Sequence, residues 1–311
     1  MPAFSTCWNN SRHQDGEAMV AEILELGFSN IELSHGMTIN KLPGIQRAFD
    51  QKMFTCAGVH NFFPSPVEVM IDAPDAYEFT SHREWDRKRA MDMTLKTLDV
   101  AASFNAGYLV LHMGSVPINP KRWTKKLTAM VGDGLQREPK CVKLRHKFIR
   151  KREKIGPLYY ERAAEALAAI AERAADVGVK LAVESRSRYE DVPSEAEMIR
   201  LMDQFKDDPW VGYWHDIGHV QLKHNLGLLD HSQWLEKMSP HLIGGHIHDV
   251  EWPARDHRVP YFGATIDYAG LLPFFPENAP LVWELSPTRD AEQIREALRM
   301  WRDEFADAPT A

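Results

Sequence analysis

Short apolar runs alternate with longer amphipathic segments along almost the whole chain, and this alternation predicts the fold. Between most of the runs lie stretches with apolar residues at helical spacing, such as Met19–Leu26 and the alanine-rich Leu158–Val177. The strict alternation predicts a parallel sheet covered by helices, and eight units predict a closed (β/α)8 barrel. The runs expected to form strands are Ala3–Trp8, Asn30–His35, Thr55–Phe62, Tyr108–Met113, Lys180–Ser185, Val211–His215, Ile243–Asp249 and Leu281–Leu285.

Residues typical of helix ends support this interpretation. Gly178 stands between a predicted helix and the next strand, where a left-handed residue often ends a helix. Ser194 and Asp290 each precede early acidic residues and therefore predict helix starts. A dinucleotide-binding sheet would carry a glycine-rich turn after its first strand, but Trp8-Asn-Asn-Ser-Arg-His follows here. We expect an α/β barrel that forms a single domain over residues 1–311.

One segment interrupts the alternation. Residues 116–157 link strand four to its helix, are too long for an ordinary loop, and are rich in Lys and Arg with few acids. Because the links that follow barrel strands lie on the catalytic face, this insertion is a candidate lid or interface element. A solvated helical excursion, whose charges serve solubility, is the alternative interpretation.

Composition narrows the functional classes. The 311 residues carry a net charge of −7, which argues against broad binding to nucleic acids or membranes. Three cysteines without paired spacing indicate a reducing compartment. No cationic start leads into an apolar stretch, and no apolar run approaches the ~20 residues that span a bilayer. We therefore expect a cytoplasmic protein with no signal peptide.

Four of the predicted strands end on a metal-ligand type of residue. Glu184, Asp216, His246 and Glu284 lie at the ends of strands five to eight. Because strand C-termini converge at one mouth of a parallel barrel, we expect the four side chains to hold one divalent metal ion. Taken alone, each of these residues is explained as a structural polar side chain that is paired with a neighbour at a strand end. Three carboxylates and one imidazole suit Mn²⁺, Mg²⁺ or Co²⁺, and Zn²⁺ is an alternative.

Further polar and aromatic residues lie near this predicted mouth. His60 and His112 close strands three and four, and His219 follows Asp216 by three residues. Lone histidines at strand ends are often structural, and core packing explains an aromatic residue such as Trp8 as readily as a sugar site does. These residues are hypotheses for substrate contact.

From residue 3 to residue 303 the chain resembles the xylose isomerase-like barrel superfamily. The most specific part is Glu184-x-x-x-Arg188-x-Glu190, which is similar to ketose 3-epimerases, and Asp216-x-x-His219 and Glu284 also match. The resemblance implies that Glu184 and Glu284 are both metal ligands and acid/base residues. It favours His246 as the remaining ligand, with His248 as the alternative. The expected substrate contacts are Trp8, His60, His112, Arg188, Glu190, His219 and Arg258.

The resemblance implies a divalent-metal-dependent sugar isomerase or epimerase, with Mn²⁺ as the expected ion. Such an enzyme removes the proton next to a carbonyl and stabilises the resulting enediolate on the metal. No glycine-rich phosphate cradle is evident, so we expect the substrate to be a small sugar without a phosphate. Assembly into a homo-oligomer or with a partner subunit stays open. The stretch Arg258-Val-Pro-Tyr-Phe-Gly263-Ala264-Thr265 departs from the Gly-x-Gly of simple epimerases.

Three alternatives stay open. Proton abstraction is also the first step of β-elimination, so a dehydratase or lyase acting on a keto-sugar or keto-glycoside is the runner-up. His60 and His112, with Glu184, resemble the first metal site of endonuclease IV, but Asp256-His257-Arg258 places arginine where that group needs histidine. The acidic charge also disfavours a DNA repair enzyme. A barrel that binds a sugar without catalysis is the third alternative.

Overall fold

The chain closes an eight-stranded parallel barrel, which confirms the predicted fold class. The computed structural model describes residues 2–69, 72–118 and 120–305, and the side chains of residues 120–122 lie outside that description. The strands follow the order β1-β10-β7-β6-β5-β4-β3-β2 around the barrel. The barrel strands are β1 (Ala3–Ser5), β2 (Asn30–Leu33), β3 (Thr55–His60), β4 (Tyr108–Leu111), β5 (Lys180–Glu184), β6 (Val211–Asp216), β7 (Leu242–Ile247) and β10 (Leu281–Trp283).

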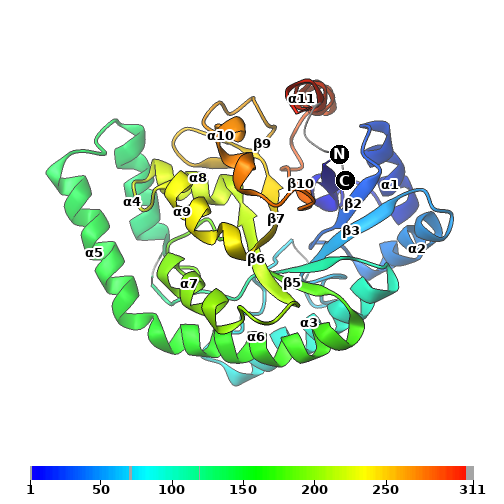
Figure 1. Ribbon diagram of the computed structural model, residues 1–311, viewed down its shortest axis with the longest axis horizontal. Helices are drawn as coiled ribbons and strands as arrows, with labels where there is room; N and C mark the ends of the chain where they lie inside the picture. Colours follow the sequence, from blue (N-terminus) through cyan, green and yellow to red (C-terminus); the bar gives the residue numbers. More distant parts are fainter. Residues whose placement is uncertain (1, 70–71, 119, 306–311) are drawn as a thin grey trace.

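Helices surround the barrel, as Figure 1 shows. Because each strand is buried on both faces, its side chains pack against the barrel interior on one side and against these helices on the other. The helices are α1 (Gly16–Glu25), α2 (Leu42–Asp50), α3 (Glu84–Ser103), α4 (Pro120–Gly132), α5 (Pro139–Ile155), α6 (Pro157–Val177), α7 (Glu195–Gln204), α8 (Ile217–Asn225), α9 (His231–Met238), α10 (Tyr268–Leu271) and α11 (Ala291–Glu304).

The predicted helix boundaries are confirmed. Gly178 ends α6 with a left-handed backbone, φ 73°. Ser194 and Glu197 form a reciprocal capping box at the start of α7, and the Asp290 side chain accepts two backbone N–H bonds at the start of α11. These caps satisfy N–H groups that a helix leaves unpaired at its first turn, so the helices begin at fixed positions relative to the strands.

The predicted seventh strand divides into two strands. β7 ends at Ile247, and Asp249 begins β8 (Asp249–Glu251), which pairs antiparallel with β9 (Arg255–Arg258). This hairpin lies outside the barrel sheet. It follows directly after the C-terminal end of β7, so it brings its residues to the same end of the barrel as the predicted metal ligands.

The insertion forms the helices α4 and α5, which stand beside the barrel in Figure 1. Arg152 of α5 is buried and forms an ion pair with both carboxylate oxygens of Glu197 on α7. Its guanidinium also donates to the Asp191 carbonyl at 2.8 Å. The insertion is therefore fixed to the loop that follows β5. Among the described residues, no helix has both the length and the apolar character that crossing a membrane requires.

Candidate functional site

The four strand-end residues predicted from the sequence come together. Glu184 and Asp216 are the last residues of β5 and β6, His246 lies near the end of β7, and Glu284 follows β10. His246 Nδ1 lies 3.2 Å from Glu184 Oε1, 3.5 Å from Asp216 Oδ2 and 3.4 Å from Glu284 Oε2. Neighbouring strands are in register, with Asp216 beside His246, so the donors end at one level of the barrel.

The spacing of these donors suits a divalent cation. Bonds of ~2.1 Å place neighbouring ligands ~3.0 Å apart in an octahedral site and ~3.4 Å apart in a tetrahedral one. The observed separations of 3.2 to 3.5 Å from His246 Nδ1 lie within about 0.1 Å of that range. All four side chains are buried, and three carboxylates in so small a space require a compensating positive charge. The residues present therefore fit a metal ion.

A buried glutamate that the sequence reasoning missed orients the imidazole of this group. His246 Nε2 lies 3.2 Å from Glu32 Oε2, and the Tyr108 hydroxyl donates to the same oxygen at 3.1 Å. A carboxylate on the second nitrogen is the usual partner of a metal-binding histidine, because it fixes the tautomer and leaves the first nitrogen free. An acid inside the short strand Asn30–Leu33 was a readable signal, because ionised side chains are seldom buried without a partner.

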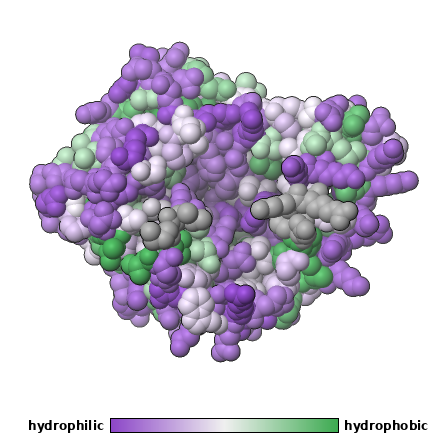
Figure 2. All heavy atoms as spheres, turned by 180° about the vertical axis from the view of Figure 1, so that it is seen from behind, coloured by the Kyte–Doolittle hydropathy of each residue, from purple (hydrophilic) through white to green (hydrophobic). Residues whose placement is uncertain are grey.

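A cavity of about 350 Å³ opens above the four donors. Glu184 and Glu284 line it, whereas Asp216 and His246 lie beneath it and are fully buried. The remaining lining residues are Cys7, His35, His60, Asp72, Pro74, His112, Arg186, Ser187, His219, Asp256, His257, Leu285, Ser286 and Pro287. Most of them are polar, and Figure 2 likewise shows a hollow in the middle of one face that is walled mainly by hydrophilic residues.

Five histidines line this cavity, and each has its Nδ1 next to a hydrogen-bond acceptor. The acceptors are the carboxylates of Asp72 for His35 and Asp75 for His112, and the backbone carbonyls of Asn61 for His60, Ser185 for His219 and Glu284 for His257. A histidine held at Nδ1 turns its Nε2 to the opposite side, and His112 Nε2 lies 2.6 Å from Glu184 Oε2. The cavity therefore gathers imidazole nitrogens whose orientation is fixed from behind.

Two acids of the loop between β3 and α3 hold the rim of the cavity. Asp72 lies 2.5 Å from His35 Nδ1, and Asp75 lies 2.8 Å from both His112 Nδ1 and Arg186 Nη2. Burial opposes the charged form of Asp75, but Arg186 and His112 outweigh it and hold the pKa of that carboxyl far below its usual range. This loop is therefore bound to the ends of β2, β4 and β5 by ionic contacts.

The charges of the proposed acid/base residues are set by their neighbours. Burial disfavours ionisation of Glu184, yet the adjacent imidazoles, His112 foremost, hold its pKa well below the usual value. Burial also disfavours ionisation of Glu284, but the neighbouring imidazoles, His246 first, outweigh it and lower its pKa to about 2. The two glutamates are thus carboxylates at neutral pH, ready to accept a proton or bind a cation.

The pKa values of the histidines next to these carboxylates are raised. Burial lowers the pKa of His219, but the carboxylate of Asp216 and then that of Glu184 raise it to about 9. The pKa of His246 is raised well above its usual value despite burial, because Glu284 and Glu32 favour the cation. Without an ion, these imidazoles carry the positive charge that the carboxylates require.

The structure places four predicted substrate contacts away from the cavity lining. The Trp8 indole donates to the Arg289 carbonyl and packs in the core against Phe4. Arg258 pairs with Glu251 within the β8–β9 hairpin. Trp8, the last residue of η1 (Thr6–Trp8), is therefore part of the core, and Arg258 is paired within the hairpin. Substrate contact by these two residues stays a prediction.

The other two, Arg188 and Glu190, contact the loop after β5 and the insertion. Arg188 forms an ion pair with Asp191 at 2.8 Å. The Glu190 carboxylate accepts from the Thr124 hydroxyl of α4 at 3.2 Å, so it holds the insertion in place. His60, His112 and His219 do line the cavity, as predicted. Side chains on a loop take directions that strand periodicity does not determine, so the sequence did not predict these two contacts. Substrate contact by Arg188 and Glu190 stays a prediction.

Other residues of the cavity were not singled out from the sequence. His35 lies two residues beyond the end of β2 and closes the run Asn30–His35 that was expected to form the strand, so the same reasoning by strand ends would have found it. His257 lies one residue before Arg258, the residue chosen in its place. Asp72, Asp75 and Arg186 lie on loops and have no periodic signal. The alternative ligand His248 bonds to Asp216 beside the four converging donors.

Comparison with known proteins identifies the family. A model of the xylose isomerase-like TIM barrel matches residues 20–304. No curated protein sequence is significantly similar to this chain. Among solved structures, a D-tagatose 3-epimerase-like protein is 16% identical, covers 98% of both chains and superimposes with a TM-score of 0.67.

Two further structures are similar over the same length. A 3-keto-D-glucoside 4-epimerase of E. coli is 15% identical, with a TM-score of 0.66, over 97% of this chain and 99% of the other. A D-psicose 3-epimerase of Clostridium cellulolyticum H10 is 15% identical, with a TM-score of 0.62, over 97% and 98%. At such low identity the likeness demonstrates a shared fold.

Proposed function

This chain belongs to the xylose isomerase-like TIM-barrel family, and on that premise we propose that it is a divalent-metal-dependent sugar epimerase or isomerase. The observation that carries the proposal is the convergence of Glu184, Asp216 and Glu284 on His246 Nδ1, at 3.2 to 3.5 Å. Three of the similar structures are named as sugar epimerases or an epimerase-like protein, which supports the same class of reaction.

The burial of the four donors supports a division of labour among them. Asp216 and His246 lie beneath the cavity, so they would hold the ion without meeting the substrate. Glu184 and Glu284 line the cavity and belong to strands separated by β6 and β7 in the barrel. A flat sugar carbon between them would present one face to each carboxylate. When bound, the divalent ion would supply Lewis-acid stabilisation of negative charge next to the substrate carbonyl.

The two glutamates can then exchange a proton with the substrate. One carboxylate takes the proton from the carbon beside the carbonyl, and the C–H electron pair moves to form an enediolate. The other glutamate, protonated from an earlier turnover or from solvent, returns a proton to the same carbon from the opposite face to give the epimer. Return of the proton to the former carbonyl carbon, with transfer of the hydroxyl proton from one oxygen of the enediolate to the other, gives the isomer. Histidines such as His219 and His257 line the cavity where substrate hydroxyls would lie.

Proton exchange provides the test. The Mn²⁺-loaded protein, incubated in D₂O with a panel of ketoses and keto-glycosides, should incorporate deuterium next to a carbonyl in at least one sugar. Proton NMR of the recovered sugar separates an epimer, an isomer and a β-elimination product, so it also tests the dehydratase or lyase alternative. Absence of exchange with every sugar in a protein that demonstrably binds Mn²⁺ would contradict the proposal.

Replacement of either glutamate should remove the exchange. Glu184→Gln and Glu284→Gln are each expected to lower its rate by about 10²- to 10⁴-fold, the usual contribution of a positioned acid or base. Glu292→Gln makes the same chemical change at an exposed glutamate of α11 and should leave the rate unchanged. Wild-type rates in both site variants would show that these carboxylates do not transfer the proton.

One observation favours a second function. His60, His112 and Glu184 also place donor atoms within 4.8 Å of one another, as the predicted likeness to endonuclease IV requires. The charge of the protein disfavours DNA, because the chain carries a net charge of −7. Cleavage of a duplex that contains one abasic site, by the Mn²⁺- or Zn²⁺-loaded protein, would establish this second function.

A further inference from the structure

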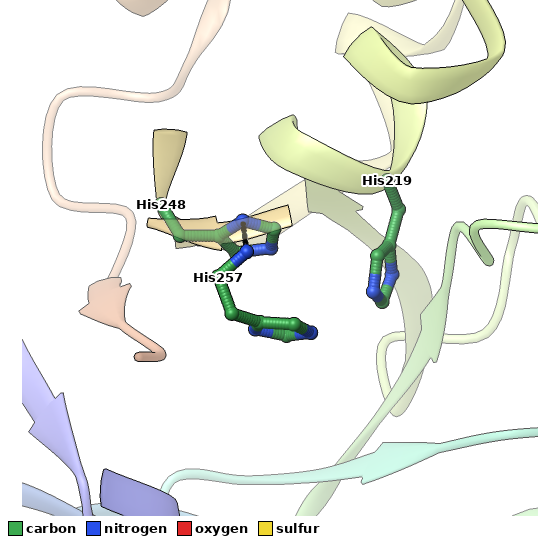
Figure 3. A group of neighbouring side chains, drawn as sticks. All are labelled: His219, His248 and His257. Carbon is green, nitrogen blue, oxygen red and sulfur yellow. Dashed lines mark hydrogen bonds between the residues drawn. The ribbon is translucent and has the colours of Figure 1, made fainter. Parts of the chain in front are cut away.

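A cluster of three histidines lies beside the four converging donors. His219 of α8, His248 of the segment after β7 and His257 of β9 place ring nitrogens within 4.8 Å of one another (Figure 3). The rings of His248 and His257 are stacked, with centroids 4.2 Å apart. By distance alone the cluster resembles a second cation site, but the hydrogen bonds of His248 assign it a different role.

Both ring nitrogens of His248 already have partners. The backbone N–H of His257 donates to His248 Nδ1 at 2.9 Å, which is the dashed line in Figure 3. A backbone N–H can only donate, so Nδ1 must be unprotonated and Nε2 must carry the proton. His248 Nε2 lies 2.9 Å from Asp216 Oδ1 and 3.2 Å from Oδ2, so it donates its proton to that carboxylate. His248 therefore has no free lone pair for a cation.

His248 and the His219 backbone together hold the carboxylate of Asp216. The backbone N–H of His219 donates to Oδ1 at 2.7 Å, and His248 Nε2 faces both oxygens, 2.9 Å from Oδ1 and 3.2 Å from Oδ2. Oδ2 lies 3.5 Å from His246 Nδ1, on the side of the converging donors. Because the His248 ring holds both oxygens and the His219 N–H holds Oδ1, the carboxylate cannot rotate without breaking hydrogen bonds in a buried environment, which is costly.

The neighbouring backbone is shaped to accommodate His248. A Cβ on Gly218 would lie 1.9 Å from His248 Cε1, so any larger residue at position 218 would displace the ring. His257 has φ 51°, a left-handed backbone that is uncommon for a residue other than glycine. That conformation directs its N–H at His248 while its Nδ1 donates to the Glu284 carbonyl at 3.1 Å. Strain of this kind persists where the surrounding contacts impose it.

We propose that His248 is a positioning residue that fixes Asp216 for metal binding, and that the β8–β9 hairpin is coupled to the metal centre through it. The inference rests on the proposed metal dependence and deepens it. The hydrogen bonds that couple them run from the His257 backbone N–H to the His248 ring, and from that ring to Asp216. Because the His257 side chain lines the cavity, a substrate that shifts the hairpin also acts on a metal ligand.

Mn²⁺ binding measured by electron paramagnetic resonance tests the role of His248. His248→Phe keeps a ring in the space but removes the donor, and should weaken Mn²⁺ binding by about 10- to 100-fold, the usual effect of losing such a partner. His248→Gln retains an N–H at a similar distance along the side chain, so it should restore affinity to within about threefold of wild type by the same reasoning. Urea unfolding of each apo variant establishes that it is folded.

Two more variants separate this role from loss of packing. His231→Phe removes another buried histidine, whose ring bonds to His215 and Gln221 and contacts none of the four donors, so it should leave Mn²⁺ affinity unchanged. His257→Gly keeps the N–H, relieves the positive φ and removes only the side chain, so it should also retain the affinity.

The outcomes distinguish this inference from the proposed function. A wild-type protein that binds no Mn²⁺ contradicts both. Tight binding by wild type with equal affinity in folded His248→Phe overturns the role of His248 and leaves the proposed metal centre standing. Equal weakening in His248→Phe and His248→Gln would also overturn it, because the donor would then not be the cause.

Discussion

Histidines determine much of the chemistry of this protein at the scale of single residues, and their neighbours determine their charge. Those beside the four converging donors are paired with carboxylates, whereas the side chains of His215 and His231 are buried and hydrogen-bonded to neutral partners. His215 Nε2 lies 3.0 Å from His231 Nε2, and His231 Nδ1 lies 2.7 Å from the Gln221 side-chain oxygen. Burial, and then the neighbouring His224, lowers the pKa of His231 to about 3.

This buried pair predicts a loss of stability in acid. The unfolded His231 takes up a proton near pH 6.5 while the folded one stays neutral to about pH 3, so its contribution is complete above pH 6.5 and is lost as pH falls towards 3. Each such group adds up to about 1.4 kcal/mol per pH unit to the slope of the unfolding free energy. His231→Gln should reduce the slope between pH 6 and pH 4 by up to that amount, as measured by urea unfolding.

A control isolates titration from packing. Val220→Ala truncates a buried residue of α8 without changing any titratable group, so it should lower the unfolding free energy equally at each pH. A pH slope in His231→Gln that equals the wild-type slope would show that the native His231 is protonated over this range.

Strand periodicity predicted which residues gather at the mouth of the barrel, but it does not predict the contacts of residues on loops. Glu184, Asp216, His246 and Glu284 were found because strand periodicity and parallel order together place them at one mouth. Glu190 and Arg188 follow β5 by only a few residues, yet their directions depend on Thr124 and Asp191. No local pattern encodes a contact of Glu190 with a helix that begins some seventy residues earlier.

At the scale of elements, the insertion is attached to the barrel by one buried ion pair. The Arg152 side chain is 1% exposed and contacts both oxygens of Glu197, and Gly156 packs closely against this pair. Glu197 also completes the capping box of α7, so one carboxylate links α5 to the start of α7. These contacts favour a fixed structural element over a mobile lid for α5.

Removal of the arginine should therefore be costly. Arg152→Met leaves the Glu197 carboxylate buried without its partner, and should lower the free energy of unfolding by about 3 to 5 kcal/mol. Arg173→Met breaks an exposed ion pair with Asp99 and should cost at most about 1 kcal/mol. Both values can be measured by urea unfolding, with limited proteolysis of residues 116–157 as a local readout. Equal costs would show that the buried pair does not anchor α5.

Element order was predictable and element detail was not. All eight barrel strands and the capped starts of α7 and α11 followed from local patterns that tertiary packing reinforces. The β8–β9 hairpin was missed because Ile243–Asp249 reads as one apolar run. Its division depends on the Asp249 side chain, which accepts from the backbone N–H groups of Val250, Gly263 and Ala264.

At the scale of the whole molecule, the four donors join strands from half of the barrel. An ion bound there by Glu184, Asp216, His246 and Glu284 would stabilise the folded state, since the unfolded chain cannot assemble the site. Mn²⁺ at a hundred times its dissociation constant should raise the free energy of unfolding by about 2.7 kcal/mol, and a chelator should remove that gain.

A variant of one donor provides the comparison. Asp216→Asn keeps the size of the side chain and removes its charge, so Mn²⁺ at the same concentration should stabilise it far less than wild type. Mg²⁺, Co²⁺ and Zn²⁺ can be compared in the same assay. Equal stabilisation of wild type and Asp216→Asn would place the bound ion elsewhere.

The attached insertion gives the molecule a pronounced electrical asymmetry. Residues 116–157 contain 13 basic and three acidic residues, while the remaining 269 residues contain 24 basic and 41 acidic ones. On α5 the side chains of Lys140, Lys143, Lys147, Arg150, Lys151 and Lys154 are exposed. A cation-exchange resin at neutral pH and low ionic strength should therefore retain this anionic protein by one side, whereas its overall charge alone would send it through the column.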